Sequence, residues 1–143
     1  MSLTNFPIFR SIIPVYIPYI FVYGFYIQIN GKVSPGGGFQ AGVIFASALI
    51  LINQVFGDRR FSKYINNISL TLCAVSGVTI YFLTGLTSLI FDANFLDYSV
   101  LFENTKTAQK IGIFTIEIGV GITVSSVMYL IYDLFSIDSF RHE

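Results

Sequence analysis

Glu117 is the residue of this chain whose type and position most strongly suggest chemistry. It lies six residues inside the apolar segment 111–135, which is about 9 Å along a helix axis. That places it roughly a third of the way into a bilayer core of about 30 Å. Acids at such depth are costly and usually face protein or water along an ion or proton path. Glu117 is therefore our candidate for such a path, and a structural role as a buried contact is the alternative.

Small residues near Glu117 predict close packing of its helix. Gly121 follows on the same helical face, while Gly112 and Gly119 share a second, nearby face. Small residues let helix backbones approach one another in membranes, so we expect these glycines to be helix contacts. A similar stripe in the preceding apolar segment consists of Ser69, Cys73 and Gly77.

A glycine-rich turn, here called the glycine corner (residues 34–42), leads into another apolar segment. Consecutive glycines allow positive φ and close approach, whereas proline fixes one dihedral and removes a donor. Such a turn is costly to order unless something packs tightly on it, so we expect a protein contact here. The predicted close-packing motif comprises Pro35, Gly36, Gly37, Gly38, Phe39 and Gly42.

The composition indicates that most of the chain lies in a lipid bilayer. The chain has 143 residues, of which 54% are hydrophobic and 11% charged, against about 25% charged in ordinary globular domains. A membrane-spanning helix needs about 20 mostly apolar residues. The sequence predicts an all-α membrane protein of one domain, residues 1–143, with short loops and four transmembrane helices at about 12–29, 39–56, 68–91 and 111–135.

The distribution of basic residues predicts the orientation. Four crossings place both termini and the second connection on one side, which carries Arg10, Arg59, Arg60, Lys63 and Arg141. The other side carries only Lys32, Lys106 and Lys110, together with three acids, so the positive-inside rule predicts cytoplasmic termini. Pro14 and Pro18 interrupt the first apolar run, which favours a retained helix over a cleaved signal peptide.

Several functions are disfavoured by what the sequence lacks. A net charge of zero argues against nucleic acid as a partner. The single cysteine and single histidine form no cluster that could hold a metal, and no Ser/His/Asp arrangement suggests hydrolysis. We therefore expect no cofactor and no enzymatic activity of the chain alone.

Two stretches resemble a known family over nearly the whole chain. Residues 31–42 lead into the alanine- and leucine-rich run 46–51, and this pattern resembles the signature of the B subunit (MnhB/MrpB type) of multisubunit Mrp sodium/proton antiporters. Residues 116–124, with Glu117, Gly119 and Gly121, resemble that family's last helix. The length and the four-helix layout are similar as well.

The resemblance implies a multi-pass subunit of the bacterial plasma (inner) membrane that is inactive by itself. Its implied partners are membrane lipid and the other subunits of the complex, including large antiporter subunits akin to those of respiratory complex I. The implied transported ions are sodium and protons. Two alternatives remain: a purely structural scaffold subunit of that complex, and the related subunit of a membrane-bound energy-converting hydrogenase.

Overall fold

The fold is all-helical, as the composition predicts. A computed structural model describes residues 7–31, 36–56, 66–91, 93–100 and 104–141. Within them lie four long helices, α1 (Pro7–Asn30), α2 (Gly38–Phe56), α4 (Asn67–Ile90) and α5 (Thr105–Arg141), and one 3₁₀ turn, η2 (Tyr98–Val100). All four long helices are long and apolar enough to cross a membrane.

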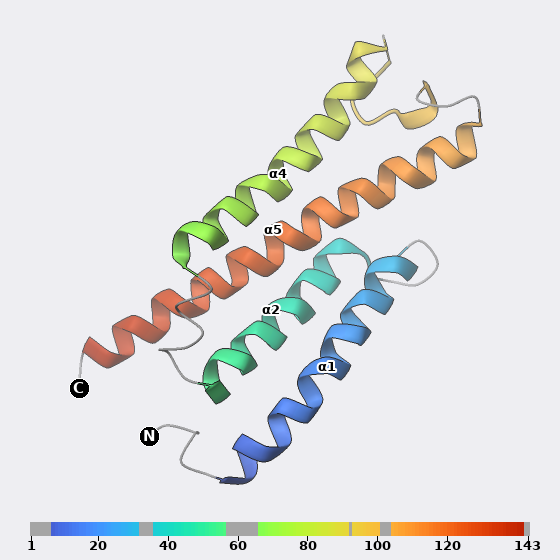
Figure 1. Ribbon diagram of the computed structural model, residues 1–143. Helices are drawn as coiled ribbons and strands as arrows, with labels where there is room; N and C mark the ends of the chain where they lie inside the picture. Colours follow the sequence, from blue (N-terminus) through green and yellow to red (C-terminus); the bar gives the residue numbers. More distant parts are fainter. Residues whose placement is uncertain (1–6, 32–35, 57–65, 92, 101–103, 142–143) are drawn as a thin grey trace.

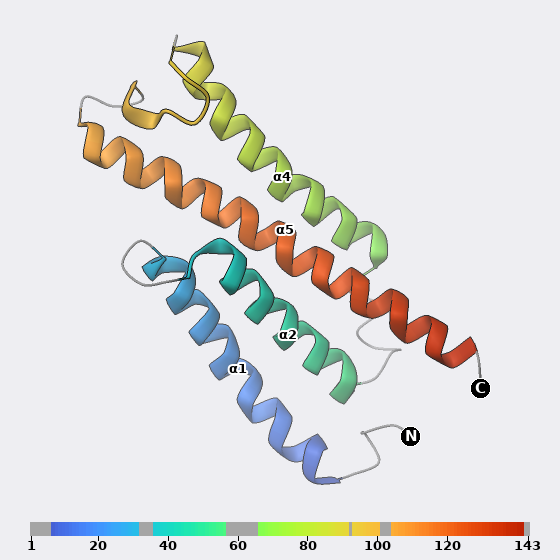
Figure 2. The ribbon, with the colours of Figure 1, turned by 180° about the vertical axis from the view of Figure 1, so that it is seen from behind.

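The helices alternate in direction and lie side by side around α5 (Figures 1 and 2). α2 and α4 pack on opposite sides of α5, and α1 packs on the outer side of α2. α1 begins and α5 ends toward the same end of the bundle (Figure 1). This up-and-down arrangement fits four successive crossings of a bilayer.

The first and last helices extend beyond the predicted apolar runs. α1 begins at Pro7 and α5 spans 37 residues, from Thr105 to Arg141. The amides of Thr107 and Ala108 both bond to the carbonyl of Asn104, which starts α5 ahead of its apolar stretch. Lysine and glutamine are good helix formers. The polar residues before residue 111 are therefore helical, although they lie outside the apolar run that must be helical within a bilayer.

The connection between α4 and α5 folds back onto the helices through two aromatic rings. The ring of Phe95 lies on Gly85 of α4, and the ring of Tyr98 lies on Gly112 of α5. Tyr98 is buried, and this burial raises the pKa of its hydroxyl, with a smaller contribution from Tyr81. The missing Cβ atoms of the two glycines provide the space for both rings.

Most large apolar side chains of the described residues point outward rather than into a core. The fully buried positions on the spanning helices are mainly small, such as Ala41, Ala46 and Ala48 of α2. Exposed Val, Leu, Ile and Phe side chains occur along α1, α4 and α5, whereas in α2 the only exposed ones are Phe39 and Phe56, at its two ends. Close backbone contacts inside and apolar side chains outside are what a helix bundle in lipid requires.

Candidate functional site

Gly31 at the end of α1 and Gly37 of the glycine corner lie against the side chain of Glu117. A Cβ atom added to Gly31 would lie 3.1 Å from Oε1 of Glu117, and one added to Gly37 would lie 3.3 Å from the same oxygen. Gly37 also has a φ of +99°, a conformation that L side chains rarely adopt. The glycines thus form a notch at the junction of α1 and α2, and the carboxyl group of Glu117 occupies it.

The backbone of α5 approaches α2 as closely as the side chain does. A Cβ atom on Gly38 would overlap the carbonyl oxygen of Glu117, and one on Gly42 would lie 2.8 Å from the carbonyl oxygen of Gly121. Both pairs are four residues apart, so one helical turn of α2 lies directly against one turn of α5. This contact fixes the height and rotation at which Glu117 leaves its helix.

The notch lies at the amino-terminal end of α2. Gly38 is the first residue of that helix, and its first turn is closed by the bond from the amide of Ala41 to the carbonyl of Gly37. The leading amides of a helix have no acceptors within it, and the helix dipole makes this end positive. Glu117 therefore faces a helix end that favours negative charge.

Two buried polar atoms in this region have no hydrogen-bond partner among the described residues. They are Oε2 of Glu117, an acceptor, and Nε2 of Gln28, an amide donor. Gln28 of α1 is 7% exposed, and its Oε1 lies 2.8 Å from where a Cβ of Gly121 would be. Because Gly121 follows Glu117 by one helical turn, Gln28 lies one turn farther along α5 than the carboxyl group.

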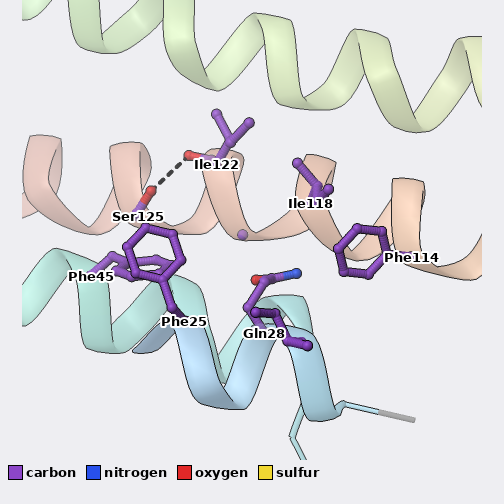
Figure 3. Close-up of a pocket in the computed structure, with 9 residues that line it drawn as sticks. Phe25, Gln28, Phe45, Phe114, Ile118, Ile122 and Ser125 are labelled. Atoms are coloured by element: carbon purple, nitrogen blue, oxygen red, sulfur yellow. Dashed lines mark hydrogen bonds between the residues drawn. The ribbon is translucent and has the colours of Figure 1, made fainter. Parts of the chain in front are cut away.

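Gln28 also borders an apolar cavity of about 370 Å³ between α1 and α5. Figure 3 shows its amide between the rings of Phe25 and Phe45 on one side and the ring of Phe114 on the other. The hydroxyl of Ser125 lies in the same wall but bonds to the carbonyl of Ile122 in its own helix (Figure 3). Gln28 is thus the one amide side chain of this cavity wall.

Comparison with known proteins decides the family. A family model described as a domain related to the MnhB subunit of Na⁺/H⁺ antiporter matches residues 8–130, which include all the residues of the notch. The chain belongs to this MnhB-related family.

Individual relatives cover most of the MnhB domain at moderate identity. This chain is 25% identical over 115 residues to a Bacillus subtilis (strain 168) protein named as the B subunit of a Na⁺/H⁺ antiporter, covering 73% of this chain and 80% of the relative. It is 28% identical over 130 residues to the protein named putative antiporter subunit mnhB2 in Staphylococcus haemolyticus (strain JCSC1435), covering 89% and 92%. The mnhB2 protein of Staphylococcus aureus (strain Newman) is 25% identical over 130 residues, covering 84% and 92%. No solved structure matches the chain.

The opposite face of α5 holds a second close contact in this MnhB domain. A Cβ atom on Gly119 would lie 2.8 Å from the carbonyl oxygen of Gly77 in α4, and one on Gly77 would overlap the hydroxyl of Thr123. That hydroxyl lies 2.9 Å from the carbonyl of Gly119 and 3.3 Å from the carbonyl of Ala74 in α4. The contacts with α2 and α4 therefore lie at the same level of α5.

The residues singled out by the sequence are placed differently from one another. Gly37, Gly38 and Gly42 lie against α5, whereas Gly36 and Phe39 are exposed and Pro35 lies outside the described residues. Gly119 meets α4 and Gly121 meets α1 and α2, but Gly112 carries the ring of Tyr98 rather than another spanning helix. In the stripe of α4, Gly77 is buried while Ser69 and Cys73 are exposed.

The sequence reasoning did not single out Gln28. It stands between Ile27 and Ile29 near the end of the first apolar run, where an amide resembles an ordinary residue at the membrane surface. The signal that could have found it is the presence of a second long polar side chain within a spanning segment, since such residues need partners inside the protein.

Proposed function

We propose that this chain is a non-autonomous subunit of a multisubunit cation (sodium)/proton antiporter, in which Glu117 lends its carboxyl group to an ion or proton path. The subunit packs between larger subunits in a bacterial plasma membrane, with both termini in the cytoplasm. The assignment as a subunit rests on the family and on relatives named as antiporter subunits. The role of Glu117 rests on the geometry of the notch.

The observation that carries this role is a buried, unpartnered carboxyl oxygen inside the spanning part of α5. Oε2 of Glu117 has no hydrogen-bond partner among the described residues, and a buried acceptor left unsatisfied costs about 1–3 kcal/mol. A purely structural glutamate is expected to use both oxygens. A carboxyl group that takes up and releases a proton, or contacts a cation, keeps one oxygen available for that exchange.

The carboxyl group lies beside the amino-terminal end of α2, which is the positive end of the helix dipole. The backbones of α2 and α5 are in close contact next to it, at Gly38 and Gly42. A proton path through this region could include Gln28, whose buried Nε2 has no partner among the described residues and whose side chain lies beside Gly121, one helical turn from Glu117.

The experiment compares Glu117→Gln with Glu117→Asp in the assembled complex. Glutamine keeps the size and one oxygen but cannot titrate, so we expect a normally assembled complex with sodium-dependent antiport reduced at least tenfold in inverted vesicles. Aspartate ionises with a shorter reach and is expected to retain part of the activity. Thr115→Val is the matched control, since its hydroxyl bonds to Ile111 within α5 and its loss is expected to leave transport unchanged.

The scaffold alternative predicts the opposite result. Glutamine forms hydrogen bonds as well as a protonated glutamate does, so a scaffold carrying Glu117→Gln would transport normally at every pH. That outcome would remove the ion-path role while leaving the subunit assignment in place. Co-purification with hydrogenase subunits rather than antiporter subunits would instead overturn the assignment to an antiporter.

A further inference from the structure

α1 carries a row of tyrosines on the side that faces away from the bundle. Its members, here called the tyrosine face, are Tyr16, Tyr19, Tyr23 and Tyr26, which are 60%, 69%, 57% and 59% exposed. Their spacing of three, four and three residues keeps them on one face of the helix. The buried residues Ile17, Gly24 and Gln28 occupy the opposite face. The tyrosine face is thus the outermost surface of α1.

The tyrosine face lies in the middle of the membrane-spanning part of α1. That part is Ser11–Asn30, and at 1.5 Å per residue Tyr19 and Tyr23 lie within about 4 Å of its centre. Tyrosine at a membrane surface places its hydroxyl at the headgroups. From the centre of a core of about 30 Å the hydroxyls of these two residues cannot reach that level.

The hydroxyls of α4 show how an outward polar group can instead be satisfied in lipid. Thr71, Ser76 and Thr79 are exposed on α4, and their hydroxyls donate to the carbonyls of Asn67, Cys73 and Val75 within the same helix. Short side chains can bond back in this way. A tyrosine hydroxyl stands at the far end of a rigid ring, beyond the reach of its own helix carbonyls, so it needs an acceptor from elsewhere.

We propose that the tyrosine face is covered by a transmembrane helix of a different subunit that presents hydrogen-bond acceptors to the tyrosine hydroxyls, whereas the outward face of α4 meets lipid. Residues 11–30 contain no charged side chain, so the hydroxyls are the polar groups that α1 offers along this face. Tyrosines bury about 150–250 Å² each and are enriched in protein interfaces. The inference that the covering helix is a different chain rests on the proposed function as a subunit.

Site-specific photo-cross-linking tests which face meets protein. Benzoylphenylalanine replaces Tyr19 or Tyr23 in one set of complexes and Leu72 or Val75 of α4 in another, and native membranes are irradiated before solubilisation. The α1 positions are expected to give an adduct with one other subunit, identified by mass spectrometry, and the α4 positions are not. Lipid adducts alone, or no protein adduct, at the α1 positions would overturn the proposal, as would an adduct of two copies of this chain.

Removal of the hydroxyls alone tests the hydrogen bonds. The double variant Tyr19→Phe, Tyr23→Phe keeps both rings and is therefore expected to fold. Because it lacks both hydroxyls, we expect it to co-purify in detergent with about five- to tenfold less of the subunit that the cross-linking identifies. Thr79→Val is the control and is expected to leave recovery unchanged, because its hydroxyl is satisfied within α4. Equal recovery from the double variant and the control would refute a polar contact.

These outcomes are separate from those of the proposed function. An adduct at the tyrosine face with a subunit of another kind of complex would support the docking surface and refute the antiporter assignment. An antiporter complex that forms without any contact at the tyrosine face would support the antiporter assignment and refute the docking surface.

Discussion

Gly38→Ala is the smallest change that tests whether the contact between α2 and α5 holds Glu117 in position. The added Cβ would overlap the carbonyl oxygen of Glu117, with the carbonyl carbon 2.8 Å away and the Cα 3.0 Å away. All three are backbone atoms, so no side-chain rotation relieves the overlap. The two helices must separate, and Glu117 must move out of the notch.

The size of the effect follows from the competing terms. Ordinary Cβ contacts lie at 3.4–4 Å, so the helices must part locally by about 1 Å, and a gap of that size forfeits up to half of each neighbouring dispersion contact. Overpacking of this kind costs about 1–3 kcal/mol. Alanine is a better helix former than glycine by up to about 1 kcal/mol, which offsets part of the cost. We expect a net loss of about 1–2 kcal/mol.

The measurement is thermal or detergent-induced unfolding of the complex together with antiport in inverted vesicles. Gly36→Ala is the control, because Gly36 is exposed and its Cβ would come closest to a side-chain methyl of Ile27 at 3.0 Å, a contact relieved by a shift of a few tenths of an ångström. We expect Gly38→Ala to lower both stability and transport and Gly36→Ala to change stability by less than about 0.5 kcal/mol. Equal stability and transport in the two variants would falsify the reasoning.

Three further predictions concern the rest of the molecule. Thr123→Val removes the hydroxyl contact with α4 and is expected to destabilise the bundle by about 0.6 kcal/mol, and by at most about 1.7, in detergent unfolding. Hydrogen bonds from the hydroxyl and amide of Ser99 lower the pKa of Asp97, so this turn is stabilised above the unfolded-state pKa and loses that contribution as pH falls through the folded-state value. Ser99→Ala is expected to raise the pKa of Asp97 toward 3.8 in an NMR titration, and an unchanged value would contradict the assignment. Cysteines placed at Lys32 and Lys63 are expected to react with an impermeant thiol reagent from opposite sides of the membrane, and labelling of both from one side would refute the topology.

The number and type of the spanning elements could be predicted because each follows from a local run of apolar residues. The start of α5 could not be predicted in this way. Its first turns consist mainly of polar residues that lie before the apolar run, so the length of the apolar run does not define where the helix begins. The packing of Tyr98 on Gly112 was also missed. A glycine in an apolar run has the same local pattern whether it faces a helix or a ring from a loop.

The candidate site shows the same division between local and distant information. The depth of Glu117 and the clearance of the glycine corner are local properties, and each is visible separately in the sequence. Their meeting is not, because about 80 residues of chain separate Gly37 from Glu117. The stripe of Ser69, Cys73 and Gly77 shows that a shared helical face does not guarantee a shared contact, since Gly77 is buried while the other two are exposed. Spacing defines a face but not what covers it.

The two close contacts of α5 make this helix the mechanical link between the halves of the bundle. Glu117 contacts α2 and Gly119 contacts α4. Because two residues turn a helix by about 200°, α5 is in close contact with a helix on each of two opposite faces at the same level. A shift of α4 cannot be absorbed by sliding α5 toward α2, because backbone already touches backbone there. A displacement of α4 within the bundle would therefore be transmitted across α5 to the carboxyl group of Glu117. In such an arrangement, a bulky residue at Gly77 would disturb Glu117 without touching it.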